Sequence, residues 1–118
     1  RGFVFASAVS YLLKKPLIMF RKKNKLPAET HSVDFELEYG TATIEVHKDS
    51  ISKGDSVLII DDLIATGGTA EAAAKLVEIS RGNVAAFIFA INLFDLGGSD
   101  NLIKRGYKIE NLIDFPGH

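Results

Sequence analysis

Two adjacent carboxylates followed closely by two glycines form the most chemically informative segment of the chain. Asp61 and Asp62 come directly after the apolar run Val57–Ile60, and the segment Ala65–Thr69, which reads Ala-Thr-Gly-Gly-Thr, comes shortly after them. Adjacent glycines let the backbone curl so that several N–H groups point at one anion, and threonine hydroxyls can donate further hydrogen bonds. The two carboxylates lie too close to this predicted anion site to be the groups that bind the anion. They suit sugar hydroxyls or a hydrated Mg²⁺ instead.

A strand and a helix must position these groups. The run Val57–Ile60 has no polar member, which is typical of a central parallel strand that is covered on both faces, and a helix is predicted from about Ala70 to Ser80. Ligands of open α/β sheets bind beyond the carboxyl ends of the strands. A helix N-terminus adds partial positive charge at that place. The order of strand, acidic pair, glycine loop and helix therefore predicts a phosphate-binding cradle.

The spacing of the glycines excludes two better-known nucleotide sites. A P-loop requires Gly-x-x-x-x-Gly-Lys-Ser/Thr, a dinucleotide-binding loop requires Gly-x-Gly-x-x-Gly, and the chain contains neither. The absence of cysteine also excludes disulfides, thiolate zinc sites and cysteine nucleophiles. A purely structural Gly-Gly turn before a helix remains the alternative interpretation at this point.

Composition narrows the class of protein further. The chain has 118 residues, enough for one domain with a real core, and its 47% hydrophobic content excludes a disordered chain. With 14 Lys+Arg against 15 Asp+Glu it lacks the basic excess typical of nucleic-acid-binding proteins. Its longest apolar run falls short of the ~18 residues that span a membrane, and no segment reads as a secretory signal. These features predict a cytoplasmic protein with neither a nucleic acid nor a membrane as partner.

The alternation of short apolar runs with longer helical patterns predicts an α/β fold. We expect an open, mainly parallel sheet flanked by helices, with an antiparallel excursion from Ser32 to His47 that carries a mobile loop. The helices are predicted at Phe3–Leu13, Ala70–Ser80 and Asn101–Arg105, and the strands at Leu17–Phe20, Ser32–Tyr39, Thr41–His47, Val57–Ile60, Val84–Leu93 and Tyr107–Ile113.

The segment Val57–Thr69 resembles the signature of the type I phosphoribosyltransferases, which bind phosphoribosyl pyrophosphate (PRPP). The resemblance implies that Asp61 and Asp62 contact the ribose hydroxyls. It implies that the 5′-phosphate is held by Ala65, Thr66, Gly67, Gly68 and Thr69. Mg²⁺ is the implied cofactor, carried by PRPP and not bound directly by the protein, with water-mediated contact to one of the two aspartates.

Other segments resemble the members of that family that act on adenine. They are Arg1-Gly2-Phe3, Arg21–Pro27, Leu37-Glu38-Tyr39-Gly40, Asn92–Gly98 and Phe115–His118. The resemblance as a whole extends over essentially all of the chain, and it implies a single core domain, residues 1–118, that lacks the family's usual N-terminal segment. The implied reaction is Mg²⁺-dependent transfer of the phosphoribosyl group from PRPP to adenine, which yields AMP and pyrophosphate in purine salvage. The implied assembly is a homodimer.

The resemblance also assigns roles to two further regions. It implies that Glu38 exchanges a proton with the purine near N7, although an exposed strand carboxylate is the alternative from the sequence alone. Pyrophosphate binding is implied for Arg1, Arg21, Lys22 and Lys25. Cations at these positions would stabilise the charge that grows on the departing pyrophosphate, whereas a solvated basic loop is the alternative.

Two further functions stay open at this stage. One is a regulator of the same fold that senses PRPP without catalysis, and the other is a phosphoribosyltransferase for another purine. A truncated product that keeps the fold but little activity is a third possibility. The sequence does not decide base selectivity, because in the adenine enzymes much of the base pocket comes from the N-terminal segment.

Overall fold

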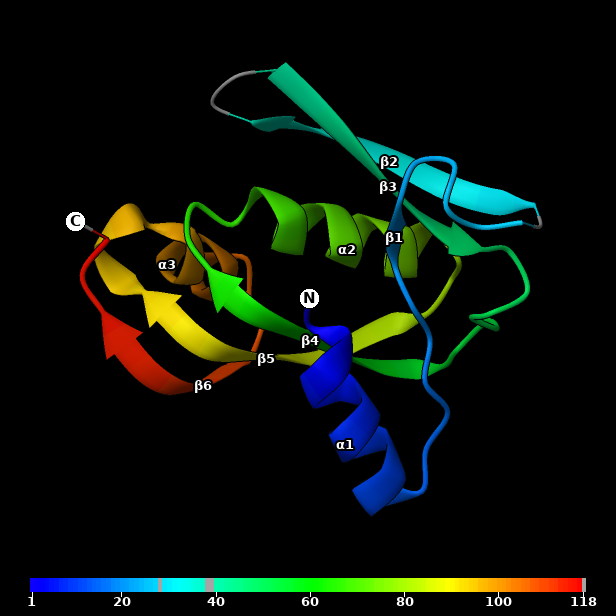
Figure 1. Ribbon diagram of the computed structural model, residues 1–118, viewed down its shortest axis with the longest axis horizontal. Coiled ribbons are helices and arrows are strands. Elements are labelled where there is room, and N and C mark those ends of the chain that lie inside the picture. Colours follow the sequence, from blue (N-terminus) through cyan, green and yellow to red (C-terminus); the bar gives the residue numbers. More distant parts are fainter. Residues whose placement is uncertain (28, 38–39, 118) are drawn as a thin grey trace. The chain divides into compact units, whose positions relative to one another are not determined.

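The computed structural model describes residues 1–27, 29–37 and 40–117 and has an α/β fold (Figure 1). Its elements are α1 (Phe3–Leu13), β1 (Arg21–Lys22), β2 (Thr30–Leu37), β3 (Gly40–His47), β4 (Ser56–Ile64), α2 (Gly68–Ile79), β5 (Asn83–Leu93), the 3-10 helix η1 (Phe94–Leu96), α3 (Gly98–Lys104) and β6 (Ile109–Phe115). One sheet has the order β4-β5-β6 and is parallel, and the other has the order β1-β3-β2 and is antiparallel. The predicted fold class and the antiparallel excursion are therefore confirmed.

The chain divides into two compact units. The first unit comprises Arg1–Leu17, Leu58–Gly67 and Ala85–His118, and the second comprises Ile18–Val57 and Gly68–Val84. The boundary between Gly67 and Gly68 falls inside the predicted phosphate-binding segment. That the chain is one core domain stays a prediction.

Aromatic packing forms the core of the first unit. Phe87 and Phe89 alternate along β5, so both rings lie on one face of the sheet, where both are fully buried. Their ring centroids lie 5.9 Å apart, and the Tyr107 ring meets Phe87 edge-on at 5.3 Å. β5 pairs with β6 in parallel register from Phe87 opposite Ile109 to Leu93 opposite Phe115. This packing stabilises the sheet in which β4, the strand next to β5, carries the acidic pair.

In the second unit, α2 packs against the β2–β3 hairpin. Ile44 and Val46 alternate on β3 and are buried, and α2 contributes the fully buried Leu76 and Val77. The alanine-rich face of α2 allows the helix and β2 to approach closely, because methyl side chains take little space. The hairpin register runs from Thr30 opposite His47 to Leu37 opposite Gly40.

One predicted strand is wrong. Leu17–Phe20 forms no ladder within the part of the chain that the structure describes, and Leu17 and Met19 are exposed. Pairing begins one residue later, where Arg21 lies opposite Glu45 of β3. A run of apolar residues becomes a strand only when a neighbouring strand accepts its hydrogen bonds, and tertiary contacts decide where that neighbour lies.

Several predicted boundaries also shift. β4 continues past the acidic pair to Ile64, α2 begins at Gly68 and not at Ala70, and α3 begins at Gly98 and not at Asn101. Ile64 is 2% exposed, so burial of its side chain extends β4. Gly97 has φ +85°, a conformation that permits the sharp turn into α3.

Candidate active site

The acidic pair lies within β4 in the first unit. Asp61 and Asp62 are both half-buried. The backbone N–H of Asp62 donates a hydrogen bond of 2.8 Å to Oδ1 of Asp61, which orients that carboxylate. Gly2 packs against it so closely that a Cβ there would lie 2.7 Å from the Ile60 carbonyl oxygen and 2.8 Å from Asp61 Oδ1. Only glycine fits this position.

Arg1 contacts the acidic pair. Its Nε lies 3.2 Å from Oδ2 of Asp62, and the side chains are 89% and 30% exposed, respectively. The structure thus brings together a residue predicted to bind pyrophosphate and one predicted to bind ribose. Exposed ion pairs contribute little to stability, and the role of Arg1 in binding pyrophosphate stays a prediction.

The environment of Asp61 disfavours its negative charge. Burial raises the pKa of this carboxyl above its usual value, and the side chain of Asp62 raises it further, while the backbone N–H of Asp62 acts in the opposite direction. Perturbed carboxyl groups of this kind are typical of functional sites. A hydroxyl donor or a cation beside Asp61 would relieve the unfavourable charge.

The raised pKa of Asp61 leads to a prediction about stability. Since the folded state holds this proton more tightly than the unfolded state, the free energy of unfolding falls as pH rises through the folded-state pKa. We expect Asp61→Asn to raise the melting temperature at neutral pH, with a smaller gain in acid, because asparagine keeps the acceptor for the Asp62 N–H without the charge. Thermal melts against pH measure this effect, with Glu110→Gln on β6 as an exposed control. A lower melting temperature at neutral pH would contradict it.

The loop after β4 is shaped by close contact between two glycines. Gly67 has φ +93°, and a Cβ there would lie 3.1 Å from the Cα of Gly98. Gly98 donates its N–H to the Ala65 carbonyl at 3.2 Å, and a Cβ at Gly98 would lie 2.8 Å from the Gly67 nitrogen. The turn Ala65–Gly67 therefore rests on the first residue of α3.

Gly98 was not among the predicted site residues. It lies outside the predicted helices and strands, yet it supports the predicted phosphate loop from a distant part of the chain. A second adjacent glycine pair was the available signal, since glycine is required wherever two backbone segments touch.

In the second unit, the start of α2 supplies the other predicted phosphate-binding groups. Gly68 and Thr69 are the first two residues of α2, so their N–H groups have no partner within the helix. The Thr69 hydroxyl is exposed, as is that of Thr66 in the first unit.

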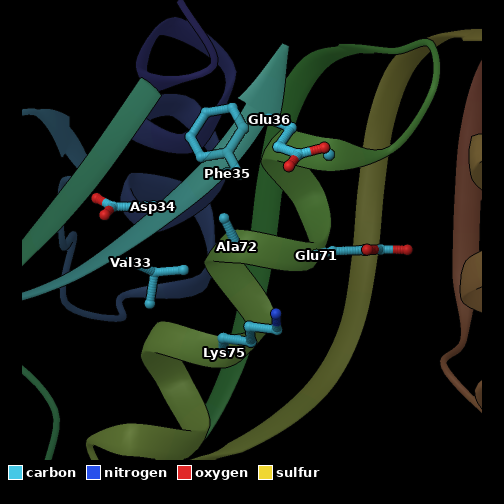
Figure 2. A pocket seen from close by; sticks show the side chains of 8 residues that line it. Val33, Asp34, Phe35, Glu36, Glu71, Ala72 and Lys75 are labelled. Carbon is cyan, nitrogen blue, oxygen red and sulfur yellow. The ribbon is translucent and has the colours of Figure 1, made fainter. Parts of the chain in front are cut away.

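Strand β2 lies over the start of α2. A Cβ at Gly68 would be 3.5 Å from the Glu36 carbonyl oxygen and 3.7 Å from the Phe35 ring. Beside this contact is a cleft of about 320 Å³ between β2 and α2, with the methyl group of Ala72 directed toward β2 and Lys75 at its edge (Figure 2). Strand β2, which leads toward Glu38, is thus in contact with α2, whose first two residues belong to the predicted phosphate site.

The basic loop is a compact turn on the antiparallel sheet. Arg21 and Lys22 form β1 and lie opposite Glu45 and Ile44 of β3. Lys25 donates its N–H to the Lys22 carbonyl at 3.3 Å, which closes the turn. All three cations are exposed, as a ligand-binding role requires. Their role in binding pyrophosphate stays a prediction.

Glu38, the predicted catalytic residue, lies outside the described residues together with Tyr39, so its role also stays a prediction. Among the described residues, no group of three or more His, Cys, Asp and Glu side chains is arranged to hold a metal ion. None of the helices in these residues is long and apolar enough to cross a membrane.

The family profile and the known proteins that match this chain belong to one family. A family profile described as phosphoribosyl transferase domain matches residues 1–114. The adenine phosphoribosyltransferase of Pelagibacter ubique (strain HTCC1062) is 89% identical over 118 residues, which are 100% of this chain and 67% of that protein.

Two crystal structures are also similar. Adenine phosphoribosyltransferase from Thermoanaerobacter pseudethanolicus ATCC 33223 superposes with a TM-score of 0.92 at 49% identity, covering 98% of this chain and 66% of that one. The Saccharomyces cerevisiae enzyme, complexed with an imino-altritol bisphosphate and adenine, has a TM-score of 0.89 at 37% identity, covering 95% of this chain and 62% of that one.

This chain spans about two thirds of the length of the relatives it matches. The family profile covers nearly all of this chain, and the similarity extends over both of its units. The chain therefore belongs to the phosphoribosyltransferase family, and within it to the adenine phosphoribosyltransferases.

Proposed function

We propose that this protein transfers the phosphoribosyl group of PRPP to adenine and releases AMP and pyrophosphate, a purine salvage reaction. The observation that carries the proposal is the strand β4, which places Asp61 and Asp62 immediately before a turn held against Gly98. Carboxylates for ribose hydroxyls next to a glycine turn for phosphate match the two ends of a ribose 5-phosphate. The adenine bound in the yeast relative supports the choice of base.

Each group has a proposed part in the transfer. The phosphate loop and the acidic pair hold ribose 5-phosphate still, which reduces the entropic cost of the reaction. The C1–oxygen bond to pyrophosphate breaks as a bond forms between C1 and N9 of adenine. Arg1 and the basic loop stabilise the departing pyrophosphate, and Glu38 accepts the proton that the imidazole ring of adenine loses as N9 bonds to C1.

The residues present fit Mg²⁺ carried by PRPP. Aspartate carboxylates are hard oxygen donors that Mg²⁺ binds directly or through water, and Asp61 gains most from a nearby cation because its pKa is raised by burial. When bound, Mg²⁺ would neutralise part of the charge on the pyrophosphate group.

The small-molecule partners are PRPP, adenine, AMP and pyrophosphate, and we propose neither a nucleic acid nor a membrane as partner. The formal net charge of -1 supports this choice, since nucleic-acid-binding surfaces are usually basic. We place the reaction in the cytoplasm, because the highly charged PRPP does not cross lipid bilayers unaided.

The decisive experiment is turnover of the full chain with PRPP, Mg²⁺ and each purine. AMP formation from adenine, with little product from hypoxanthine or guanine, supports the proposal. Preference for another base indicates the second candidate, and PRPP binding without any turnover indicates a sensor. A Glu38→Gln arm tests the proton-transfer role, because glutamine keeps the size of the side chain without its acid–base function.

We also propose that the protein acts as a homodimer. Helix α1 supports this, because none of its residues is buried and it exposes Phe3, Val4, Phe5, Tyr11, Leu12 and Leu13. Apolar surface of this extent usually marks an interaction site. We expect light scattering after size exclusion to give this chain a mass above that of a monomer. Replacing Leu12 and Leu13 by serine should lower the apparent mass if α1 lies in the contact, whereas a monomeric wild-type protein would contradict the proposal.

A further inference from the structure

One carboxylate holds the basic loop at two points, its tip and its junction with β2. Oε1 of Glu45 accepts a hydrogen bond of 2.7 Å from the backbone N–H of Asn24, which lies between Lys22 and Lys25. Oε2 of the same side chain accepts one of 3.0 Å from the hydroxyl of Thr30, where the loop returns to β2. A single half-buried side chain thus ties the cationic tip and the far end of the loop to the middle of β3.

The backbone at this place needs such support. Asn24 has φ +65°, a left-handed conformation that L-residues rarely adopt. Hydrogen bonds on either side keep the turn in place, from the Lys23 N–H to the Thr43 carbonyl at 3.2 Å and from the Lys25 N–H to the Lys22 carbonyl at 3.3 Å. The hydrogen bond from the Asn24 N–H to Glu45 holds the turn at its left-handed residue.

The charges in this turn also require a stabilising partner. Arg21, Lys22 and Lys25 all lie within a few residues and repel one another. Glu45 lies opposite Arg21 in the β1–β3 pair, and its carboxylate bonds to an amide and a hydroxyl, so the cations stay exposed. Glu45 therefore offsets the repulsion while the cations remain accessible to an anion.

We propose that Glu45 is a positioning residue that holds the basic loop ready for pyrophosphate. This inference rests on the proposed function, in which Arg21, Lys22 and Lys25 bind that group. A loop held in its binding conformation before the ligand arrives loses less entropy on binding. Glu45 acts through the loop and does not touch the ligand.

The test compares Glu45→Ala with Glu45→Gln in the full chain, with pyrophosphate, PRPP and AMP as calorimetric ligands. Glu45→Ala should weaken pyrophosphate and PRPP by about fivefold or more and leave AMP within about twofold. Glu45→Gln should retain most of the affinity, because its amide can accept from Asn24 and donate to Thr30. Hydrogen exchange at the Asn24 amide should become faster in Glu45→Ala only.

Asp55→Ala is the matched control. Asp55 is also a carboxylate that accepts a backbone N–H hydrogen bond in a turn, from Ser52 at 2.8 Å, but this turn lies outside residues 21–30, so pyrophosphate affinity should stay at the wild-type value. Wild-type pyrophosphate affinity in Glu45→Ala, or an equal loss for AMP, would overturn the inference. If Glu45→Ala fails to fold, Thr30→Val removes one of the two bonds and should give a smaller loss in the same direction, and no loss would again overturn it.

The outcomes separate this inference from the proposed function. If neutralising Arg21, Lys22 and Lys25 leaves pyrophosphate binding intact, the proposed role of the loop itself fails. If that change abolishes binding and Glu45→Ala does not weaken it, only the positioning role of Glu45 fails.

Discussion

Replacing Asp61 and Asp62 together by asparagine should lower turnover of PRPP and adenine by about a hundredfold, and each single change by about tenfold or more. Both carboxylates lie half-buried in β4 directly before the phosphate loop, and asparagine keeps their size but loses the charged acceptor. The loss should therefore arise from weaker contact with the ribose hydroxyls and not from a damaged core. Steady-state kinetics with both substrates varied measures the effect.

The fold must be shown to survive this double change. We expect an unchanged circular dichroism spectrum and a melting temperature no lower than that of the wild type, because Asp61 already carries an unfavourable charge. Glu110→Gln, an exposed carboxylate change on β6, should leave turnover unchanged. Near-wild-type turnover in the double variant would remove the acidic pair from the site.

The second large effect is expected in the basic loop. Changing Arg21, Lys22 and Lys25 together to alanine should weaken pyrophosphate and PRPP by about a hundredfold while AMP loses little. The reason is that AMP carries only the 5′-phosphate, which the loop around Gly67 is proposed to hold. Calorimetry with the three ligands separates the two sites.

A charge-matched control guards against a general electrostatic effect. Alanine at Lys53, Lys104 and Lys108 removes the same number of positive charges from exposed positions elsewhere on the chain. We expect this control to bind pyrophosphate like the wild type at moderate salt, where distant charges are screened. An equal loss of all three ligands in the basic-loop variant would place the pyrophosphate site elsewhere.

Local patterns were sufficient for much of the fold and for the order of strand, acidic pair, glycine turn and helix. The unbroken apolar run before Asp61 indicated a buried parallel strand, and the alternation on both sides of Gly40 indicated an antiparallel hairpin, because burial on two faces and on one face leave different patterns. The same logic failed at Leu17–Phe20, where an apolar run has no strand partner among the described residues. Residue type alone also does not account for Phe3 and Phe5 of α1, which are apolar yet exposed.

The chain's sequence by itself determined which chemistry is available: an acidic pair, a glycine turn before a helix, and a cluster of cations. These signals are local, because each depends on residues that are neighbours along the chain. The tertiary structure alone decided that Gly98 supports the Gly67 turn, that Arg1 contacts Asp62, and that Glu45 holds the basic loop. Each of these contacts joins residues far apart in sequence, and periodicity carries no information about such pairs. They arise only when burial of Phe87 in the first unit and of Leu76 in the second fixes the strands and helices of each unit in place.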